Sequence, residues 1–238
     1  EAPGVNFIIN RGKIQKLPNK FKFHKRIPIL AIGSNRSPSQ LLRKFGKLEI
    51  IPVTNIIVNN FDVTYASLIS YYGAVPATLW PVKGSKLQLS IIWLNESQLK
   101  VMHETEAVGK AYEFVKFDNE VINFKSSFII KGNIFGYVSK FGALNFGSKT
   151  FEVRALSAIK AKKRMLKSIN QQKALRFLSS KILNISSKKN IFDFRNKVIS
   201  DKNYRFETIK KLNKIGIQPA ATPWKIVRNI KTKSIKFY

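Results

Sequence analysis

The chain has 238 residues, no cysteine and a formal net charge of +30 at pH 7. The lack of cysteine excludes disulfides, thiolate metal sites and cysteine nucleophiles. Its 44% hydrophobic content is too high for general disorder, and the longest apolar runs fall short of the ~20 residues that a membrane-spanning helix needs, so a soluble or peripheral protein is expected.

Basic residues concentrate at both ends of the chain. Residues 1–50 hold 11 Lys and Arg against 2 Asp and Glu, residues 51–150 hold 9 against 7, and residues 151–238 hold 23 against 4. This distribution is typical of a nearly neutral globular unit that carries cationic extensions. We therefore expect a basic arm over residues 1–26, a folded domain over 27–150 and a basic helical extension over 151–238.

The first regular elements form a strand, a loop and a helix. The apolar run Ile27–Ile32 predicts a buried strand, and Ser37 and Pro38 favour the start of a helix that continues through Gln40–Phe45. Stretches rich in β-branched and aromatic residues, separated by Asn, Gly and Pro, then predict successive strands. These are Pro52–Val58, Phe61–Leu68, Ala77–Trp80 and Leu87–Leu94.

Helical spacing returns after the strands. Asn95 is a good N-cap for a helix over Glu96–Glu106. Two more strands are expected at about Ala111–Phe117 and Ile134–Val138. Periodic apolar positions then predict one long amphipathic helix or two shorter ones over Ala155–Leu183, and a further helix over Asp201–Ile215.

Two short stretches carry residues suited to chemistry. Gly33, Ser34 and Asn35 follow the first buried strand, where free N–H groups at a helix start can hold a carboxylate or phosphate. Glu106 ends the helix after Asn95, and a buried carboxylate can act as a general base. A plain turn and a solvated helix end are the simpler alternatives. With only two histidines, we expect no metal site and no cofactor.

Several motifs occur in order along the chain. They are LAIGSN at Leu30–Asn35, GAVPATL at Gly73–Leu79, IWLN at Ile92–Asn95 and the acidic cluster Glu104–Glu106. Over roughly residues 28–140 this succession resembles the γ-glutamylcyclotransferase family. The resemblance implies an α+β fold, a small mixed β-barrel with flanking helices, to which the chain adds its basic helical extension.

The same resemblance implies a reaction on a small γ-glutamyl substrate. The backbone of Gly33, Ser34 and Asn35 would hold the γ-glutamyl group, Glu106 would move protons, and Tyr112 would contact the substrate. The substrate's α-amino group would then attack its own γ-carbonyl and release 5-oxoproline. The chain departs from the family at Ile32, where a Tyr is usual, and at Ala107, where a Gly is usual.

The charge supports a non-catalytic alternative, in which the fold is the scaffold of a basic component of a ribosome or another RNA assembly. The C-terminal third would contact phosphates through its basic residues, and Trp224, Phe237 or Tyr238 would stack on bases. A coding bias toward Lys, or a peripheral protein on an anionic membrane, are further alternatives. The candidate phosphate contacts are Lys160, Lys162, Lys163, Arg164, Lys167, Lys188, Lys189, Lys210 and Lys211.

Two compartments are considered. A cytoplasmic protein is the first expectation. The mitochondrion is the alternative, because no acid occurs between Ala2 and Leu48, as in many mitochondrial leaders.

Overall fold

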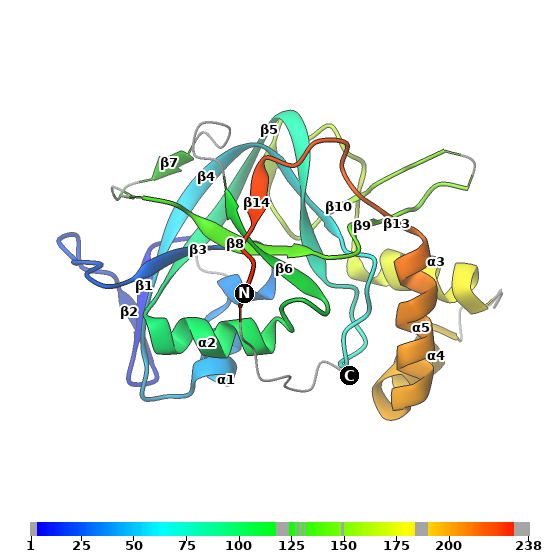
Figure 1. The fold of residues 1–238 in the computed structure, drawn as a ribbon, viewed down its shortest axis with the longest axis horizontal. Coiled ribbons are helices and arrows are strands. Elements are labelled where there is room, and N and C mark those ends of the chain that lie inside the picture. The colour runs from blue at the N-terminus through cyan, green and yellow to red at the C-terminus, as the bar shows by residue number, and fades with distance from the viewer. Residues whose placement is uncertain are drawn as a thin grey trace.

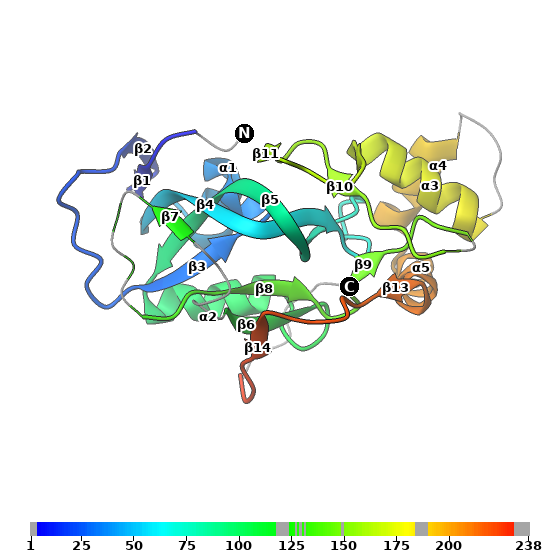
Figure 2. The same cartoon turned by 90° about the horizontal axis from the view of Figure 1, so that it is seen from above.

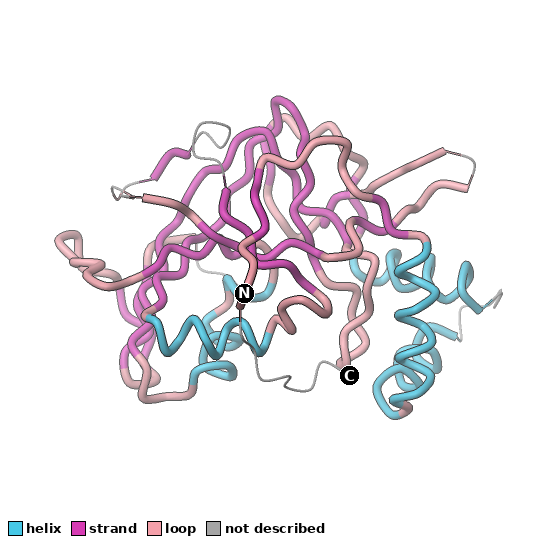
Figure 3. The backbone as a smooth tube through the Cα atoms, in the orientation of Figure 1, coloured by secondary structure: helices cyan, strands magenta, loops and turns pink. Residues whose placement is uncertain are grey.

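The computed structural model describes residues 4–117, 124–126, 128, 130, 132–148, 150–183 and 190–230. Strands fill the centre of the molecule, α1 and α2 lie together below them, and α3, α4 and α5 form a group at one end (Figures 1 and 3).

The strands are β1 (Phe7–Asn10), β2 (Lys13–Lys16), β3 (Ile27–Ala31), β4 (Ile50–Tyr65), β5 (Ala77–Leu94), β6 (Tyr112–Phe117), β7 (Phe124–Ser126), β8 (Phe135–Ser139), β9 (Ala143–Leu144), β10 (Ala155–Leu156), β11 (Ala161–Lys162), β12 (Ser168–Ile169), β13 (Gly216–Ile217) and β14 (Trp224–Ile226). The helices are the 3-10 turn η1 (Ser34–Arg36), α1 (Pro38–Phe45), α2 (Glu96–Thr105), α3 (Gln171–Leu183), α4 (Asn190–Ser200) and α5 (Lys202–Lys214).

The long antiparallel hairpin of β4 and β5 is the centre of the sheet. The sequence predicts two strands in each of these segments, and the structure has one. In β4 the Asn residues that suggest a boundary between two strands form a β-bulge within one strand. The register shifts between Asn59 and Phe61, and Asn60 adopts a φ of 63°. The Asn60 side chain accepts a hydrogen bond from the Gly84 N–H at 2.9 Å, which joins the bulge to the opposite strand.

The α+β class is confirmed, but the expected small β-barrel is not supported as a closed one, because the main sheet is open. Its path runs β12-β10-β4-β5-β3-β8-β6-β14, and no ladder between described residues joins its two ends. The sheet curls strongly, so that β8, β6 and β14 fold back beneath β4 and β5 (Figure 2), and Trp224 stacks on Phe61 at 6.4 Å. Where β8 approaches the start of β5, a side chain makes the contact: the Ser139 N–H donates to Thr78 Oγ1 at 2.9 Å.

The curled sheet is buried on both faces. Along β3, Ile29 and Ala31 pack into the cluster that also contains the helices, whereas Leu30 and the following Ile32 pack into the cluster inside the curl. Successive side chains of a strand point to opposite faces of the sheet, so one strand contributes side chains to both clusters. The run Ile27–Ile32 is therefore apolar throughout, as the sequence predicts for a buried strand.

Both ends of the chain contribute to the sheet. β1 pairs with β2 and with β4, so residues 7–16 form a hairpin at the sheet edge. The helix predicted over Ala155–Leu183 is wrong in its first half: β10, β11 and β12 occur there, and α3 begins only at Gln171. Lys163 adopts a φ of 54°, and Arg164 forms an ion pair with buried Asp62 of β4. These tertiary contacts overcome the helical spacing of the apolar residues.

The other helices agree more closely with the sequence. Asn95 caps α2 with a reciprocal capping box that includes Gln98, and Asp201 caps α5 by accepting from the Tyr204 N–H. Helix α4 is additional. The basic region after residue 150 is thus only partly helical. No helix within the described residues is long and apolar enough to cross a membrane.

Candidate functional site

One cavity of about 1220 Å³ lies among η1, α1, the end of α2 and the segment between β4 and β5. Gly33, Ser34, Asn35, Glu106 and Tyr112 all line it, so the five residues that the sequence predicts to contact a small substrate lie around a single space. Further walls come from the loop before β11 and from α4 and α5. The basic C-terminal region therefore forms part of this cavity.

Asn35 and Glu106 are in direct contact. The Asn35 Nδ2 donates to the Glu106 Oε1 at 2.9 Å across 71 positions of sequence. Glu106 is the C-cap of α2, and its carboxylate side chain is only 12% exposed. The Asn35 Oδ1 is buried and accepts no hydrogen bond from a described residue. An acceptor is thus available beside the carboxylate for an N–H group of a ligand.

Lys44 is a site residue that the sequence analysis missed. Its ammonium forms an ion pair with the same Glu106 Oε1 atom, and its side chain is only 7% exposed. Helix α1 presents Lys44 to the cavity together with Gln40, one turn earlier, while Leu41 is fully buried in the core. The four-residue spacing of Gln40 and Lys44, which puts both side chains on one face of a helix, was the hint that the sequence offered. It could not reveal the partner, which belongs to another helix.

The loop at Gly33 passes close to the start of β5. A Cβ on Gly33 would lie 3.2 Å from the Cβ of Ala77, which is closer than most contacts of a Cβ. The N–H groups of Arg36 and Ser37 donate back to the carbonyls of Gly33 and Ser34. By contrast, the N–H groups of Ser34 and Asn35 donate to no acceptor among the described residues, so they remain available to an anion.

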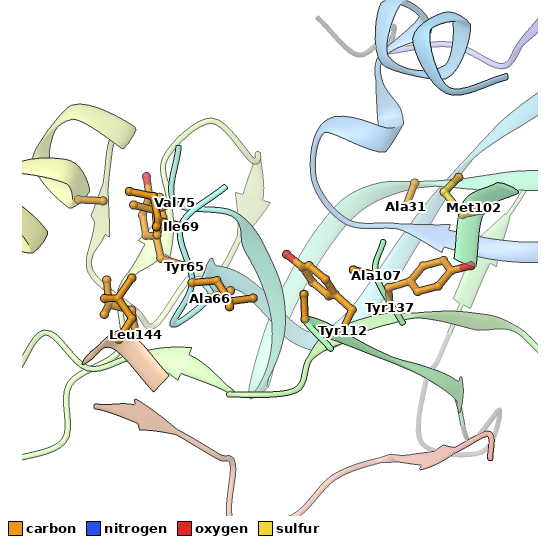
Figure 4. Packing of buried hydrophobic residues seen from close by; sticks show 14 of the residues in the cluster. Ala31, Tyr65, Ala66, Ile69, Val75, Met102, Ala107, Tyr112, Tyr137 and Leu144 are labelled. Carbon is orange, nitrogen blue, oxygen red and sulfur yellow. The ribbon is translucent and has the colours of Figure 1, made fainter. Parts of the chain in front are cut away.

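Two tyrosines form the floor of the cavity. Tyr112 of β6 and Tyr137 of β8 lie next to each other with their hydroxyls pointing in opposite directions (Figure 4). The Tyr112 hydroxyl donates to the Ala77 carbonyl at 3.0 Å, so the ring, more than the hydroxyl, is offered to a ligand. Burial and the nearby charge of Glu106 raise the pKa of both phenols well above the usual value. Both therefore stay neutral at pH 7.

His103 lies behind this floor. Its Nδ1 is 2.9 Å from the Tyr137 hydroxyl, and its ring packs edge-on against Phe114. Burial lowers the pKa of His103 to about 4, so the imidazole is neutral near pH 7. His103 is not among the residues that line the cavity, and its contact with Tyr137 fixes the orientation of that ring.

The two departures from the family motif lie close to this site. Ile32 lines the cavity and offers no hydroxyl. Ala107 follows Glu106 and adopts a φ of 47°, in the left-handed region that favours glycine. An alanine therefore occupies a conformation for which a glycine would be less strained.

The nine basic residues predicted to contact phosphates have different surroundings. Arg164 donates to both carboxylate oxygens of Asp62, at 2.8 and 2.9 Å, so it holds the loop before β12 against β4 and is not free for a phosphate. Lys210 forms an ion pair with Glu207 on the surface of α5. Lys188 and Lys189 lie outside the described residues, as do Phe237 and Tyr238. The exposed members are Lys160, Lys162, Lys163, Lys167, Lys210 and Lys211.

Trp224, the remaining aromatic residue suggested for base stacking, is partly buried between Phe61 and Phe117. The part of the chain that the structure describes contains no cluster of three or more His, Cys, Asp or Glu residues placed to hold a metal ion.

Comparison with solved structures finds an uncharacterized protein from Homo sapiens at 12% identity and a TM-score of 0.39, covering 80% of this chain and 99% of that one. A protein described as a gamma-glutamyl cyclotransferase aligns at 12% identity and a TM-score of 0.40, covering 78% and 99%. The solution structure of a protein from Arabidopsis thaliana aligns at 11% identity and a TM-score of 0.36, covering 67% and 87%. No family model and no curated protein matches the sequence.

Proposed function

We propose that the protein is a γ-glutamylcyclotransferase-type enzyme that releases 5-oxoproline from a γ-glutamyl amine or peptide. The contact of Asn35 with Glu106 inside the cavity carries the proposal. It puts a buried carboxylate beside a loop with unused N–H donors, which is what the reaction requires of an enzyme. The ordered motifs of the sequence support the same assignment.

The proposed reaction is an intramolecular aminolysis. The N–H groups of Ser34 and Asn35 hold the carboxylate of the γ-glutamyl group, and the Asn35 Oδ1 accepts from its ammonium. Glu106 takes one proton from that ammonium, and the freed amine attacks the γ-carbonyl carbon. As the five-membered lactam forms, the bond to the leaving nitrogen breaks, and protonated Glu106 gives its proton to that nitrogen. The carboxylate then accepts the second proton, which the new lactam nitrogen gives up, and passes it to the departing amine, which leaves as an ammonium ion. The products are 5-oxoproline and an amine, with no water consumed.

Lys44 acts as a positioning residue in this scheme. It pairs with Glu106 at the cavity wall and holds the carboxylate at the end of α2. A substrate ammonium that enters beside Asn35 approaches the same carboxylate, which then faces both cations. Keeping the buried charge paired before substrate arrives avoids the cost of an isolated carboxylate.

Release of 5-oxoproline from γ-glutamyl dipeptides, measured by chromatography, tests the proposal. The wild-type protein should form 5-oxoproline, and Glu106→Gln should lower kcat at least 100-fold, since general acid–base groups contribute typically 10²–10⁴-fold. Glu104→Gln is the matched control, because Glu104 is the neighbouring acid of α2 and does not line the cavity. Equal activity of the wild-type and Glu106→Gln proteins would contradict the role of Glu106.

A second candidate function is binding of RNA or another polyanion, whether or not the cavity is catalytic. The net charge of +30 favours it, as do the exposed lysines on β11, on the loop after it and on α5. Such lysines would contact phosphates without reading sequence. Binding that weakens steeply as salt rises is the expected signature of such phosphate contacts.

A further inference from the structure

The wall of the cavity is strongly cationic. Among its described lining residues, one carboxylate, Glu106, faces five basic side chains. Lys44 pairs with that carboxylate, and the other four have no acidic partner among the described residues. These four are Arg36, Arg43, Lys160 and Arg205. They come from η1, α1, the loop before β11 and α5, so the charge does not result from one basic helix.

Two of the four are not ordinary surface cations. Arg205 is only 7% exposed, and its Nη1 donates to the carbonyls of Val198 and Ile199 at the end of α4. The Arg205 Nε and the Arg36 Nε are both buried without an acceptor. Burial also lowers the pKa of Arg36. A guanidinium taken out of water is costly unless an anion compensates it, and the described residues offer none.

Arg43 and Lys160, the other two cations, are exposed to solvent. Arg43 donates to Gln40 at 2.7 Å and lies 5.8 Å from the ring centre of Tyr72, which also lines the cavity. Lys160 is also exposed and lines the cavity from the loop before β11. An anion that enters from solvent therefore meets cations before it reaches the buried guanidinium groups.

The volume indicates where such an anion would sit. About 1220 Å³ exceeds the roughly 300–1,000 Å³ that holds a drug-sized ligand. A γ-glutamyl group is much smaller than that, so most of the cavity remains for the amine portion of a substrate. Its single carboxylate would occupy the N–H groups of Ser34 and Asn35, which leaves the four cations uncompensated.

We propose that the preferred substrates are γ-glutamyl conjugates whose amine portion is itself polyanionic, with at least two carboxylate or phosphate charges that contact the Arg36, Arg43, Lys160 and Arg205 side of the cavity. The γ-glutamyl end of this inference rests on the proposed function. The polyanionic end rests on the uncompensated cations alone.

Two ligands of nearly equal size test the charge requirement. In γ-glutamylglutamate the amine portion carries two carboxylates, and in γ-glutamylglutamine one of them is a neutral amide. Calorimetry with the wild-type protein at fixed ionic strength should show at least 10-fold tighter binding of γ-glutamylglutamate. A second pair, γ-glutamyl-O-phosphoserine and γ-glutamylserine, distinguishes a phosphate preference from a carboxylate preference.

Variants then locate the effect. Arg36→Gln and Arg43→Gln should each reduce the preference for γ-glutamylglutamate over γ-glutamylglutamine to less than 3-fold. Arg176→Gln is the matched control, since Arg176 is exposed on α3, does not line the cavity and removes the same charge. Arg205 is left unchanged because it also caps α4.

The possible outcomes separate the two proposals. Equal affinity for both members of each pair overturns the polyanion inference even if 5-oxoproline is released. A preference that survives both Arg36→Gln and Arg43→Gln overturns it as well. Preferential binding without release of 5-oxoproline supports the inference and contradicts the proposed enzyme activity. Failure to bind any of the four ligands overturns both.

Discussion

Lys44 and Glu106 are separated by 62 positions in the sequence and form a buried ion pair. In such a pair the loss of water is compensated only while both charges are present. Asn35 also donates to Glu106, so the carboxylate joins η1, α1 and α2 at the cavity wall. Single substitutions here should therefore affect stability more than a double substitution that removes both charges.

A double-mutant cycle measures this coupling. Lys44→Met leaves the Glu106 carboxylate buried without its cation and should lower the free energy of unfolding by about 3 kcal/mol. Adding Glu106→Gln to Lys44→Met should recover at least half of that loss. Urea denaturation of the wild type, both single variants and the double variant gives the coupling energy. Additive effects would show that the two charges do not depend on each other.

His103 should make stability depend on pH. Its pKa is about 4 in the folded protein, against an ordinary value of 6.5, so the unfolded chain binds more protons between these two values. This contribution to stability is fully present above about pH 6.5 and is lost as the pH falls toward 4, by up to about 3 kcal/mol.

Thermal unfolding at several pH values tests this dependence. The Tm of the wild type should fall between pH 6.5 and 4, and His103→Gln, which keeps a polar group near Tyr137, should flatten that part of the curve. His24→Gln is the control, because His24 is exposed. An unchanged slope in His103→Gln would assign the acid sensitivity to other groups.

At the scale of elements, the contact of β9 with β13 connects the C-terminal helices to the sheet. Two glycines make the approach possible: a Cβ on Gly142 would lie 2.0 Å from the Ile217 carbonyl oxygen, and one on Gly216 would lie 2.0 Å from that of Phe141. Ser67 extends the connection, since its N–H donates to Gly142 and its hydroxyl to Leu212 of α5. Because Arg205 also belongs to α5, this junction positions one wall of the cavity.

Gly142→Ala should loosen this junction. Gly142 has a φ of 72°, so alanine would suffer both backbone strain and the collision with Ile217, and we expect a loss of roughly 3 kcal/mol or more. Gly84→Ala is the matched control, because Gly84 has a φ of 83° with no atom within 4 Å of the added Cβ, and it should cost only about 1–2 kcal/mol. Chemical denaturation compares them. Equal losses would mean that strain alone, without the collision, sets the cost.

For the whole molecule, charge is the dominant property. With a net charge of +30, the protein repels itself and attracts polyanions over distances set by the salt concentration. The ion pairs among the described residues are each neutral and leave the net charge unchanged, and exposed lysines occur both on the N-terminal hairpin and around β11 and α5. The distribution of the charge therefore decides whether binding is local or general.

RNA binding at increasing salt distinguishes these cases. Affinity for a single-stranded RNA should fall at least 10-fold between 50 and 200 mM salt, with a slope of about −0.7 per phosphate contacted. Changing four exposed lysines near β11 and α5 to Gln should weaken binding more than the same change at four exposed N-terminal lysines. The two sets are Lys162, Lys163, Lys167 and Lys211, and Lys13, Lys16, Lys20 and Lys22. Equal effects would indicate general charge attraction, and no binding at low salt would exclude this candidate function.

Local patterns determined most of the elements by themselves. The strand at Ile27, the helix capped by Asn95 and the helix capped by Asp201 were predictable, because apolar alternation and N-cap chemistry depend on neighbours within a few residues. Glu106 and Asn35 could be singled out for the same reason, by residue type and by short motifs.

Tertiary structure alone decided the rest. It left the sheet open, since no ladder between described residues joins the two ends of its path, and it replaced a predicted helix with strands held by Arg164 and Asp62. It also paired Lys44 with Glu106 and placed Arg205 in the cavity wall. These outcomes depend on contacts between segments tens of residues apart, and such contacts leave no periodic trace in a single sequence.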